Sequence, residues 1–258
     1  MKKETAGGSF VPHFHVIRLV ESRLLRDSLV RAEGPFLDLG CGDGSFGKSL
    51  GLQHVYGIDI DEQAIKHLKE DRYYMEVHHA SGSKMPFQDI FFSTVFSNCA
   101  IEHMDHIDRV LMEVRRILKK SGKFIFTVPT KKLFDAIKKD RLLKRNGFGQ
   151  PDALDAYNRF HHHVNIVDLD TWMEELKRRD FRVVNHKYYL RGRIGGFVAR
   201  MDMLYSIGGS EAKHLINQLE RKYWSLWGLP FRLYFYSYLR SLRCGNSGTH
   251  LMIEAEKA

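Results

Sequence analysis

The feature that most constrains the fold is an apolar segment that runs directly into a glycine-rich turn, FLDLGCGDGSFG at 36–47. Glycine adopts positive φ at little steric cost and lets a ligand lie against bare backbone. A buried strand followed by such a turn and a helix is typical of an open, mostly parallel sheet that binds ligands at the carboxyl ends of its strands. We therefore predict an α/β fold with a ligand site around 38–44.

A second landmark lies at the end of the next apolar segment, HVYGIDID, where Asp59 stands 21 residues after Asp38. A carboxylate at this place can accept hydrogen bonds from ribose hydroxyls, which favours a ligand that contains a nucleoside. The glycines alone do not choose that ligand. The run from Gly42 to Gly47 also fits the GxGxxG pattern of NAD-binding proteins.

The first half of the chain alternates short apolar runs with amphipathic stretches, which predicts βαβ units. We expect strands at 36–39, 54–60, 73–78, 94–98 and 123–128. The clearest helix follows His103, with apolar residues on one face over 107–118 and with Lys119, Lys120 and Gly122 at its end. A helix from 168 to 179 and strands at 181–190 and 249–254 complete the pattern.

Two stretches interrupt this alternation and suggest added functions. Residues 131–165 are basic and irregular, longer than an ordinary connection, and are predicted to form a lid or acceptor segment. Residues 191–248 are predicted to be a basic, aromatic, helical insertion before the last strand. We expect one domain over 1–258, with a helical lid at 1–33 and a cofactor-binding core at 34–130.

Composition adds a charge asymmetry. The net charge is +9, yet residues 1–130 hold 17 basic and 17 acidic side chains, which leaves 23 and 14 for the rest. This predicts a basic half facing an anionic partner, unless it is only a solvated surface. Three cysteines without CxxC spacing predict neither a disulfide framework nor a zinc site, so no metal is expected. No segment resembles a signal peptide or a spanning helix, so we expect a cytoplasmic protein.

Four segments together resemble the class I S-adenosylmethionine (SAM) dependent methyltransferases of the methyltransferase-11 type, roughly over 34–130. They are LDLGCGDG, VYGIDID, KMPFQDIFFSTVFSNCAIEHM and EVRRILKKSGKFIFTVP. The resemblance implies a Rossmann-like sheet of seven strands, mostly parallel with the last antiparallel, and helices on both faces. It implies SAM as the cofactor and S-adenosylhomocysteine as the product, and it weighs against NAD.

The resemblance also assigns cofactor contacts. Asp38 and the backbone at Gly40 and Gly42 would hold the methionine part, Asp59 the ribose, and Ile60 one adenine face. The remaining residues that we count with this site are Cys41 and Gly44 in the turn, Ser81 and Gly82 near the adenine, and Asn98 beside the sulfonium. Ser81 departs from the subgroup, which often has an acid there.

Residues for the acceptor side are fewer. His103 is a candidate general base, although Glu102 and His103 would equally form a structural pair that caps the next helix. Tyr157, His161 and His162 are candidate substrate contacts, with solvated or core histidines as the alternative. Adjacent histidines point in different directions, so the run 161–163 does not predict a metal site.

The acceptor itself is left open by the aromatic and arginine-rich stretch 222–243. It suits an amphipathic segment at a membrane surface or an apolar acceptor pocket, single-stranded nucleic acid, or simply packed helices. Our hypothesis is oxygen methylation of a small, lipid-linked or sugar-linked acceptor, with peripheral membrane contact through 222–243. The alternatives are an RNA methyltransferase, which the dispersed basic residues disfavour, and a SAM-binding regulatory protein without turnover.

Overall fold

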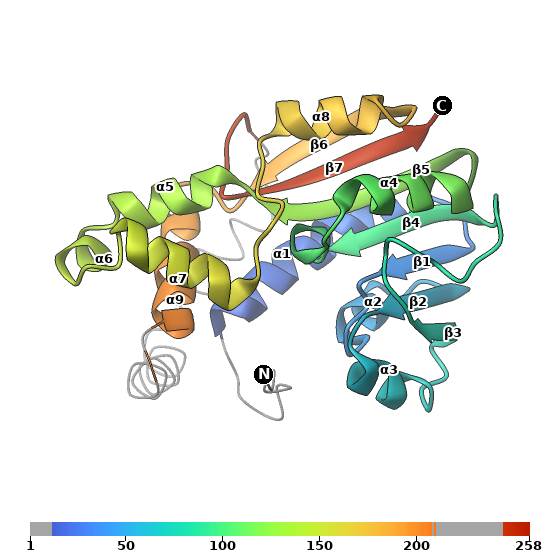
Figure 1. The fold of residues 1–258 in the computed structure, drawn as a ribbon, viewed down its shortest axis with the longest axis horizontal. Coiled ribbons are helices and arrows are strands. Elements are labelled where there is room, and N and C mark those ends of the chain that lie inside the picture. The colour runs from blue at the N-terminus through green and yellow to red at the C-terminus, as the bar shows by residue number, and fades with distance from the viewer. Residues whose placement is uncertain (1–11, 208, 210–244) are drawn as a thin grey trace.

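The computed structural model describes residues 12–207, 209 and 245–258 (Figure 1). Its centre is a seven-stranded sheet of order β3-β2-β1-β4-β5-β7-β6. The strands are β1 Phe36–Leu39, β2 Val55–Asp59, β3 Tyr74–His79, β4 Phe92–Asn98, β5 Leu118–Pro129, β6 Phe181–Tyr189 and β7 His250–Lys257. The first five pair in parallel, and β7 runs antiparallel between β5 and β6. The predicted mixed sheet is confirmed.

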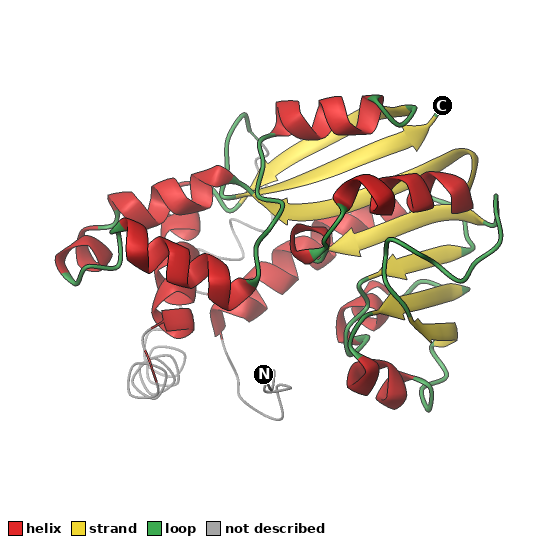
Figure 2. Ribbon diagram, in the orientation of Figure 1, coloured by secondary structure: helices red, strands yellow, loops and turns green. Residues whose placement is uncertain are grey.

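Helices cover both faces of this sheet (Figure 2). The helices of the described residues are α1 Pro12–Leu29, α2 Ser45–Leu50, α3 Glu62–Leu68, the 3-10 helix η1 Ile101–His103, α4 Ile107–Ile117, α5 Lys131–Lys139, α6 Arg141–Arg145, α7 Pro151–His161, α8 Leu169–Lys177 and α9 Gly192–Ile207. Successive side chains of a strand point to opposite faces of the sheet, so the hydrophobic core is divided into one cluster on each face. Phe124 and Phe126 pack in the cluster with α4 and α8, whereas Ile125 packs in the cluster with α1.

Helix α4 ends earlier than predicted. Its buried face is Val110, Leu111, Val114 and Ile117, as the sequence spacing indicates. Leu118, however, has an extended backbone with φ −75 and ψ 138, and it pairs with Phe92 of β4. Burial of Leu118 in the sheet therefore stops the helix before the lysines that we predicted to finish it.

The stretch 131–165 is largely helical, and our prediction of an irregular segment is wrong. Thr130 accepts a hydrogen bond from Lys132 N and begins α5, while Asp140 accepts from Leu142 N and Leu143 N and begins α6. Both are ordinary helix caps. The basic residues that suggested a loop cover the exposed sides of short amphipathic helices.

Helices α5, α6, α7 and α9 form a separate packed unit beyond the carboxyl ends of β4 and β5, on the left in Figure 1. Its core consists of Leu133, Ile137, Leu143, Leu154, Tyr157, Ala199 and Met203. The two interruptions of the αβ pattern therefore meet in space. The stretch 222–243 lies outside the described residues. Among the residues that are described, no helix combines the length and apolarity that crossing a membrane requires.

Truncation of this second core tests whether the helices form a packed unit. Ile137 is fully buried, whereas Leu142, on the next helix, is 49% exposed. We expect Ile137→Ala to lower the free energy of unfolding by about 2–5 kcal/mol, and Leu142→Ala to change it by less than about 0.5 kcal/mol. Urea denaturation measures both, and equal effects would contradict this packing.

Candidate functional site

A cleft of about 550 Å³ opens at the carboxyl ends of β1, β2 and β4. This is the edge where an open α/β sheet binds its ligands. Most of the predicted cofactor residues line it, namely Asp38, Gly40, Cys41, Gly42, Asp59, Ile60, Ser81, Gly82 and Asn98, together with His103. Arg18 of α1 also reaches the cleft wall. The structure thus brings residues from separate strands to one concave surface.

The glycine turn needs glycine for different reasons at different positions. Gly40, Gly42 and Gly44 have φ of 81, 53 and 72, in the left-handed region. A Cβ at Gly40 would collide with the Ala100 side chain, and one at Gly44 would lie 2.5 Å from Leu68 Cδ2. A Cβ at Gly42 would meet nothing within 4 Å. Gly44 therefore packs against α3 and does not line the cleft, whereas Gly42 presents open backbone to it.

Asp59 ties the turn to the second strand. Its Oδ2 accepts a hydrogen bond of 2.7 Å from Gly42 N, and its Oδ1 accepts one of 2.8 Å from Asp61 N. Each carboxylate oxygen can accept a second hydrogen bond, so the group still has capacity for a ligand hydroxyl. Asp61 accepts from Gln63 N and Ala64 N at the start of α3 and is the cap of that helix.

Asp38 is buried beneath the turn, with 3% of its surface exposed. Burial raises the pKa of this carboxyl to about 7, and the charge of Asp59 adds to the rise, while the Tyr74 hydroxyl and Arg18 oppose it. Tyr74 donates a hydrogen bond of 2.8 Å to Asp38 Oδ2. A Cβ at Gly47 would collide with both partners, which explains that glycine. The sequence analysis missed Tyr74 because only the fold brings β3 here.

The other end of the cleft carries small polar groups. The Ser81 and Ser83 hydroxyls lie 2.9 Å apart, and Ser83 N donates to Ser81 Oγ at 3.2 Å. Ile60 is 75% exposed beside them, which is unusual for an isoleucine that follows a strand. A flat apolar surface with hydroxyls at its edge suits an aromatic ring with polar substituents.

Asn98 joins a buried polar network at the end of β4. Its Nδ2 donates to Glu21 Oε2 at 2.9 Å, and its Oδ1 accepts from Thr127 Oγ1 at 2.9 Å. Both amide ends are thereby fixed at the cleft wall. Glu21 of α1 is fully buried and was missed, although an acid on the apolar stripe of α1, next to Val20 and before Leu24, was the available signal.

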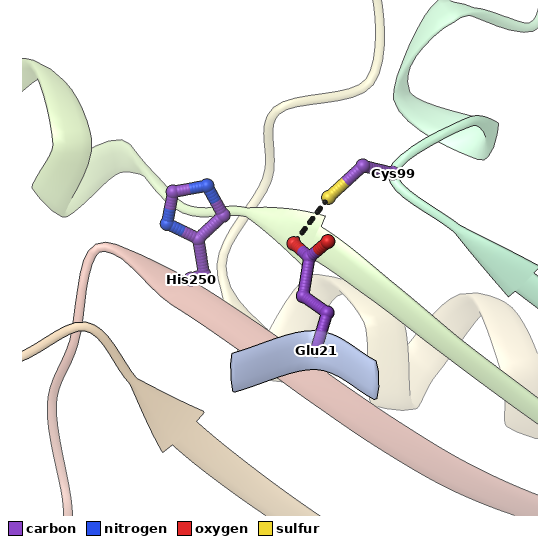
Figure 3. A group of neighbouring side chains, drawn as sticks. All are labelled: Glu21, Cys99 and His250. Atoms are coloured by element: carbon purple, nitrogen blue, oxygen red, sulfur yellow. Dashed lines mark hydrogen bonds between the residues drawn. The ribbon is translucent and has the colours of Figure 1, made fainter. Parts of the chain in front are cut away.

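Glu21 also meets Cys99 and His250 (Figure 3). One polar atom of each lies within 4.8 Å of the others. Glu21 Oε1 accepts hydrogen bonds from Cys99 Sγ at 3.0 Å and from the Tyr189 hydroxyl at 2.9 Å. These donors, with Asn98, supply the hydrogen-bond partners that a buried carboxylate needs, so the group does not require a metal ion.

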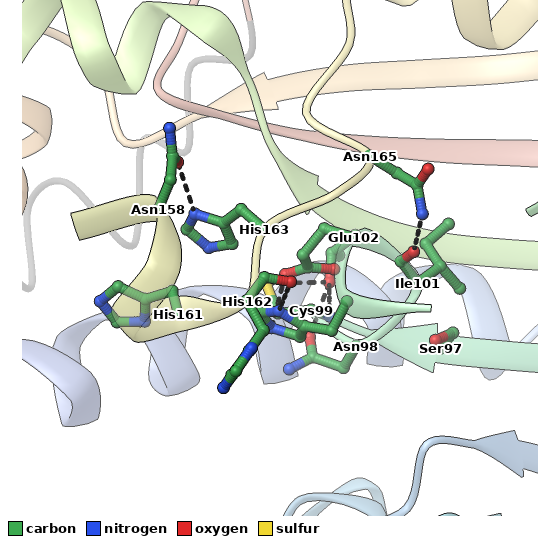
Figure 4. Close-up of polar contacts among 12 residues, drawn as sticks. Ser97, Asn98, Cys99, Ile101, Glu102, Asn158, His161, His162, His163 and Asn165 are labelled. Atoms are coloured by element: carbon green, nitrogen blue, oxygen red, sulfur yellow. Dashed lines mark hydrogen bonds and ion pairs between the residues drawn. The ribbon is translucent and has the colours of Figure 1, made fainter. Parts of the chain in front are cut away.

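His103 lines the cleft, and the other predicted acceptor-side residues do not. His161 and His162 lie at the end of α7 (Figure 4). Tyr157 is hydrogen-bonded to Asp202 within the helical unit, and His161 Nε2 lies 2.6 Å from Ser206 Oγ. His162 has φ 53 and caps the end of α7. We did not name His163 among the candidate substrate contacts. Its ring stacks on both His103 and His161.

The comparisons with known proteins give similarities to methyltransferases. A family model described as a methyltransferase domain matches residues 37–126. A malonyl-[acyl-carrier protein] O-methyltransferase of Erwinia pyrifoliae is 28% identical over 127 residues, 48% of either chain. A sarcosine/dimethylglycine N-methyltransferase of Halorhodospira halochloris is 33% identical over 122 residues, 40% of this chain and 41% of that one. The chain spans about half the length, or less, of these curated relatives.

Solved structures match over nearly the whole chain. A SAM-dependent methyltransferase of Thermotoga maritima, described as a possible histamine N-methyltransferase, has a TM-score of 0.57 at 16% identity and covers 95% of this chain and 93% of its own. A geranyl diphosphate C-methyltransferase of Streptomyces coelicolor has a TM-score of 0.56 at 13% identity and covers 93% and 77%. At this identity the likeness shows the fold.

The buried carboxyl of Asp38 predicts a pH-dependent stability. Folding raises its pKa from the ordinary 3.8 to about 7, so between these values the folded chain binds more protons than the unfolded one. Stability contributed by this group therefore falls as pH rises through that window. We expect the free energy of unfolding to fall relative to Asp38→Asn by at most about 4 kcal/mol between pH 4 and pH 7. Urea denaturation over this range measures it, and parallel curves would contradict the raised pKa.

Proposed function

We propose that this chain, which carries a class I methyltransferase domain, binds SAM in the cleft and transfers its methyl group to an acceptor. The observation that carries the proposal is the convergence of Asp38, Gly42 and Asp59 on one cleft. All three lie within the matched residues 37–126. A geranyl diphosphate C-methyltransferase with the same fold was crystallised with S-adenosylhomocysteine, which supports this choice of ligand.

Each part of the cofactor then has a partner. The ribose hydroxyls bind Asp59, which keeps its bonds to the turn, and adenine lies on Ile60 with Ser81 and the Gly82 backbone at its edge. The methionine ammonium binds near Asp38 and the Gly40 backbone. A positive ligand beside Asp38 favours its ionised form, so cofactor binding lowers the pKa that burial has raised. Cys41 forms part of the cleft wall, and Asn98 presents its fixed amide beside the sulfonium.

The reaction is an in-line displacement. As the acceptor atom bonds to the methyl carbon, the carbon–sulfur bond breaks and its electrons stay on sulfur, which leaves neutral S-adenosylhomocysteine. Positioning of the reactants can supply roughly 7–11 kcal/mol of the rate enhancement. We propose an oxygen acceptor on a small, lipid-linked or sugar-linked molecule. A hydroxyl must lose its proton, and His103 in the cleft wall is the proposed base.

The charge distribution supports an anionic acceptor. A cavity of about 350 Å³ lies between α5, the start of α9 and the loop before β7. Three basic residues, Lys132, Lys139 and Arg191, and one acid, Asp140, line it. These cations belong to the basic half of the chain and stand at the same edge of the sheet as the cleft. Contact of 222–243 with a membrane surface remains a prediction, because that stretch lies outside the described residues.

Two glycines offer a matched test of the cofactor site. Gly42 and Gly51 both have positive φ, 53 and 68, and at both an added Cβ would meet nothing within 4 Å. Alanine should therefore cost a similar strain of about 1–2 kcal/mol at each position. Only Gly42 lines the cleft. We expect Gly42→Ala to weaken SAM binding at least about tenfold, which is about 1.4 kcal/mol, and Gly51→Ala to leave it unchanged.

Isothermal calorimetry with SAM and with S-adenosylhomocysteine measures both variants. Urea denaturation confirms that they are similarly folded. Equal affinities of the two variants would place the cofactor elsewhere than on the Gly42 backbone and would contradict the proposed site.

A further inference from the structure

Glu102 holds a carboxyl group that the fold buries without completing its hydrogen bonds. The side chain is 2% exposed, and among the described residues Oε2 has no hydrogen-bond partner. Leaving a buried polar atom unpaired costs about 1–3 kcal/mol, and more if the group is charged. Glu102 directly precedes His103, which lines the cleft, and a group of this kind beside a functional site is a candidate for a role in its chemistry.

The backbone around Glu102 is held firmly by the segment that follows α7. Glu102 O accepts hydrogen bonds from Val164 N at 2.8 Å and from Asn165 N at 3.0 Å. The Asn165 amide donates to Ile101 O at 3.0 Å and to Met104 O at 2.6 Å (Figure 4). This clamp fixes η1 in one orientation. Helix α4 starts after His106 without a side-chain cap. Glu102 therefore does not cap this helix, and the alternative role that the sequence suggested for the Glu102–His103 pair is wrong.

The neighbouring imidazole is also fixed. His103 Nδ1 lies 3.4 Å from His162 O, and a carbonyl oxygen only accepts, so Nδ1 carries the proton in the neutral ring. Nε2 is then the basic nitrogen, and it lies 3.7 Å from Glu102 Oε1. The ring of His163 stacks on His103 at 5.3 Å and 14° and sets the plane of the imidazole.

We propose that Glu102 is a positioning residue for His103. Its ionised carboxylate, 3.7 Å from Nε2, stabilises the imidazolium that forms when His103 takes the acceptor's proton and favours the ring position in which that charge is closest. This inference rests on the proposed function, in which the acceptor oxygen gives its proton to Nε2 while it bonds to the methyl carbon and the sulfur keeps the electrons of the broken bond. The proton later leaves His103 for solvent, which restores the base. Glu102 acts on the imidazolium through its charge, since it lies beside the same nitrogen that takes the proton, while the His162 carbonyl holds Nδ1.

Electrostatics around the pair give it a definite pH response. Burial raises the pKa of Glu102 to about 8, the charge of Glu21 adds to the rise, and Arg18 and the Cys99 thiol oppose it. Among the described residues, the titratable neighbours include Arg18 and Glu21 on α1, Cys99 after β4, Tyr157 and His161 on α7, His163 just after it, and His250 on β7. His163 remains neutral, because burial and the nearby imidazoles lower its pKa to about 2. Ionisation of Glu102 through pH 8 is therefore expected to raise the basicity of His103.

The test uses Glu102→Gln, which keeps the shape of the side chain and removes its charge. By NMR titration of the cofactor-free chain, with the signal assigned from His103→Gln, we expect the His103 signal of the unmodified chain to move through pH 8 as Glu102 ionises, and we expect this movement to be absent from the variant. In turnover above pH 8, where Glu102 is ionised, kcat should fall by about 10- to 100-fold, and the rise of rate through pH 8 should disappear. The KM for SAM should stay unchanged.

Glu76→Gln is the matched control, because Glu76 Oε2 lies 3.1 Å from His78 Nε2 in a surface pair away from the cleft. It should leave turnover unchanged. If Glu102→Gln does not fold, Glu102→Asp keeps the charge but withdraws it from Nε2. The effects on the NMR titration of His103 and on kcat should then both appear in weaker form.

The outcomes separate the two proposals. No movement of the His103 signal through pH 8 in the unmodified chain, or a movement that persists in the folded Glu102→Gln variant, overturns the pairing, even in a chain that transfers methyl groups. A wild-type chain that does not bind SAM overturns the proposed function and the catalytic part of this inference, whereas the NMR titration still decides whether Glu102 and His103 are coupled.

Discussion

The hydrogen bond from Gly42 N to Asp59 Oδ2 is the interaction on which the site depends. It joins the turn after β1 to the end of β2, and so converts two separate strand ends into one rigid wall. The same carboxylate accepts from Asp61 N and thereby fixes the start of α3. This bond fixes the position of the cleft wall, because Asp59 holds the turn in the conformation that presents the Gly42 backbone to the cleft.

Buried acids form a second theme of this edge of the sheet. Asp38, Glu21 and Glu102 are each less than 4% exposed, although acids are among the residues least often buried. Asp38 and Glu21 have hydrogen-bond donors from distant elements, Tyr74 and Asn98 among them. Glu102 has one unpartnered oxygen. Such an arrangement lowers stability and favours the binding of cationic or proton-donating groups. A sulfonium cofactor is cationic, and the hydroxyl acceptor that we propose would donate a proton.

Much of this was readable from the sequence, and the reasons for the rest are physical. The strands of the first half and the residues of the glycine turn follow from local patterns, because apolar runs and left-handed glycines have strong local signals. Glu21 and Tyr74 reach the site only through the fold. The helices of 131–165 were hidden by their lysines and arginines, which occupy exposed faces and resemble a loop in composition. The sequence does not show which way His162 and His163 point, because their directions follow from the left-handed backbone of His162 at the end of α7.

Calorimetric titration of the full chain with SAM, S-adenosylhomocysteine and NAD tests the central claim most directly. The turn after β1 is compatible by pattern with both kinds of nucleoside ligand, so the competing ligand is a necessary part of the measurement. The account predicts that SAM and S-adenosylhomocysteine bind one per chain and that NAD does not bind. Binding of NAD in place of SAM, or no binding of SAM and its product, would contradict it.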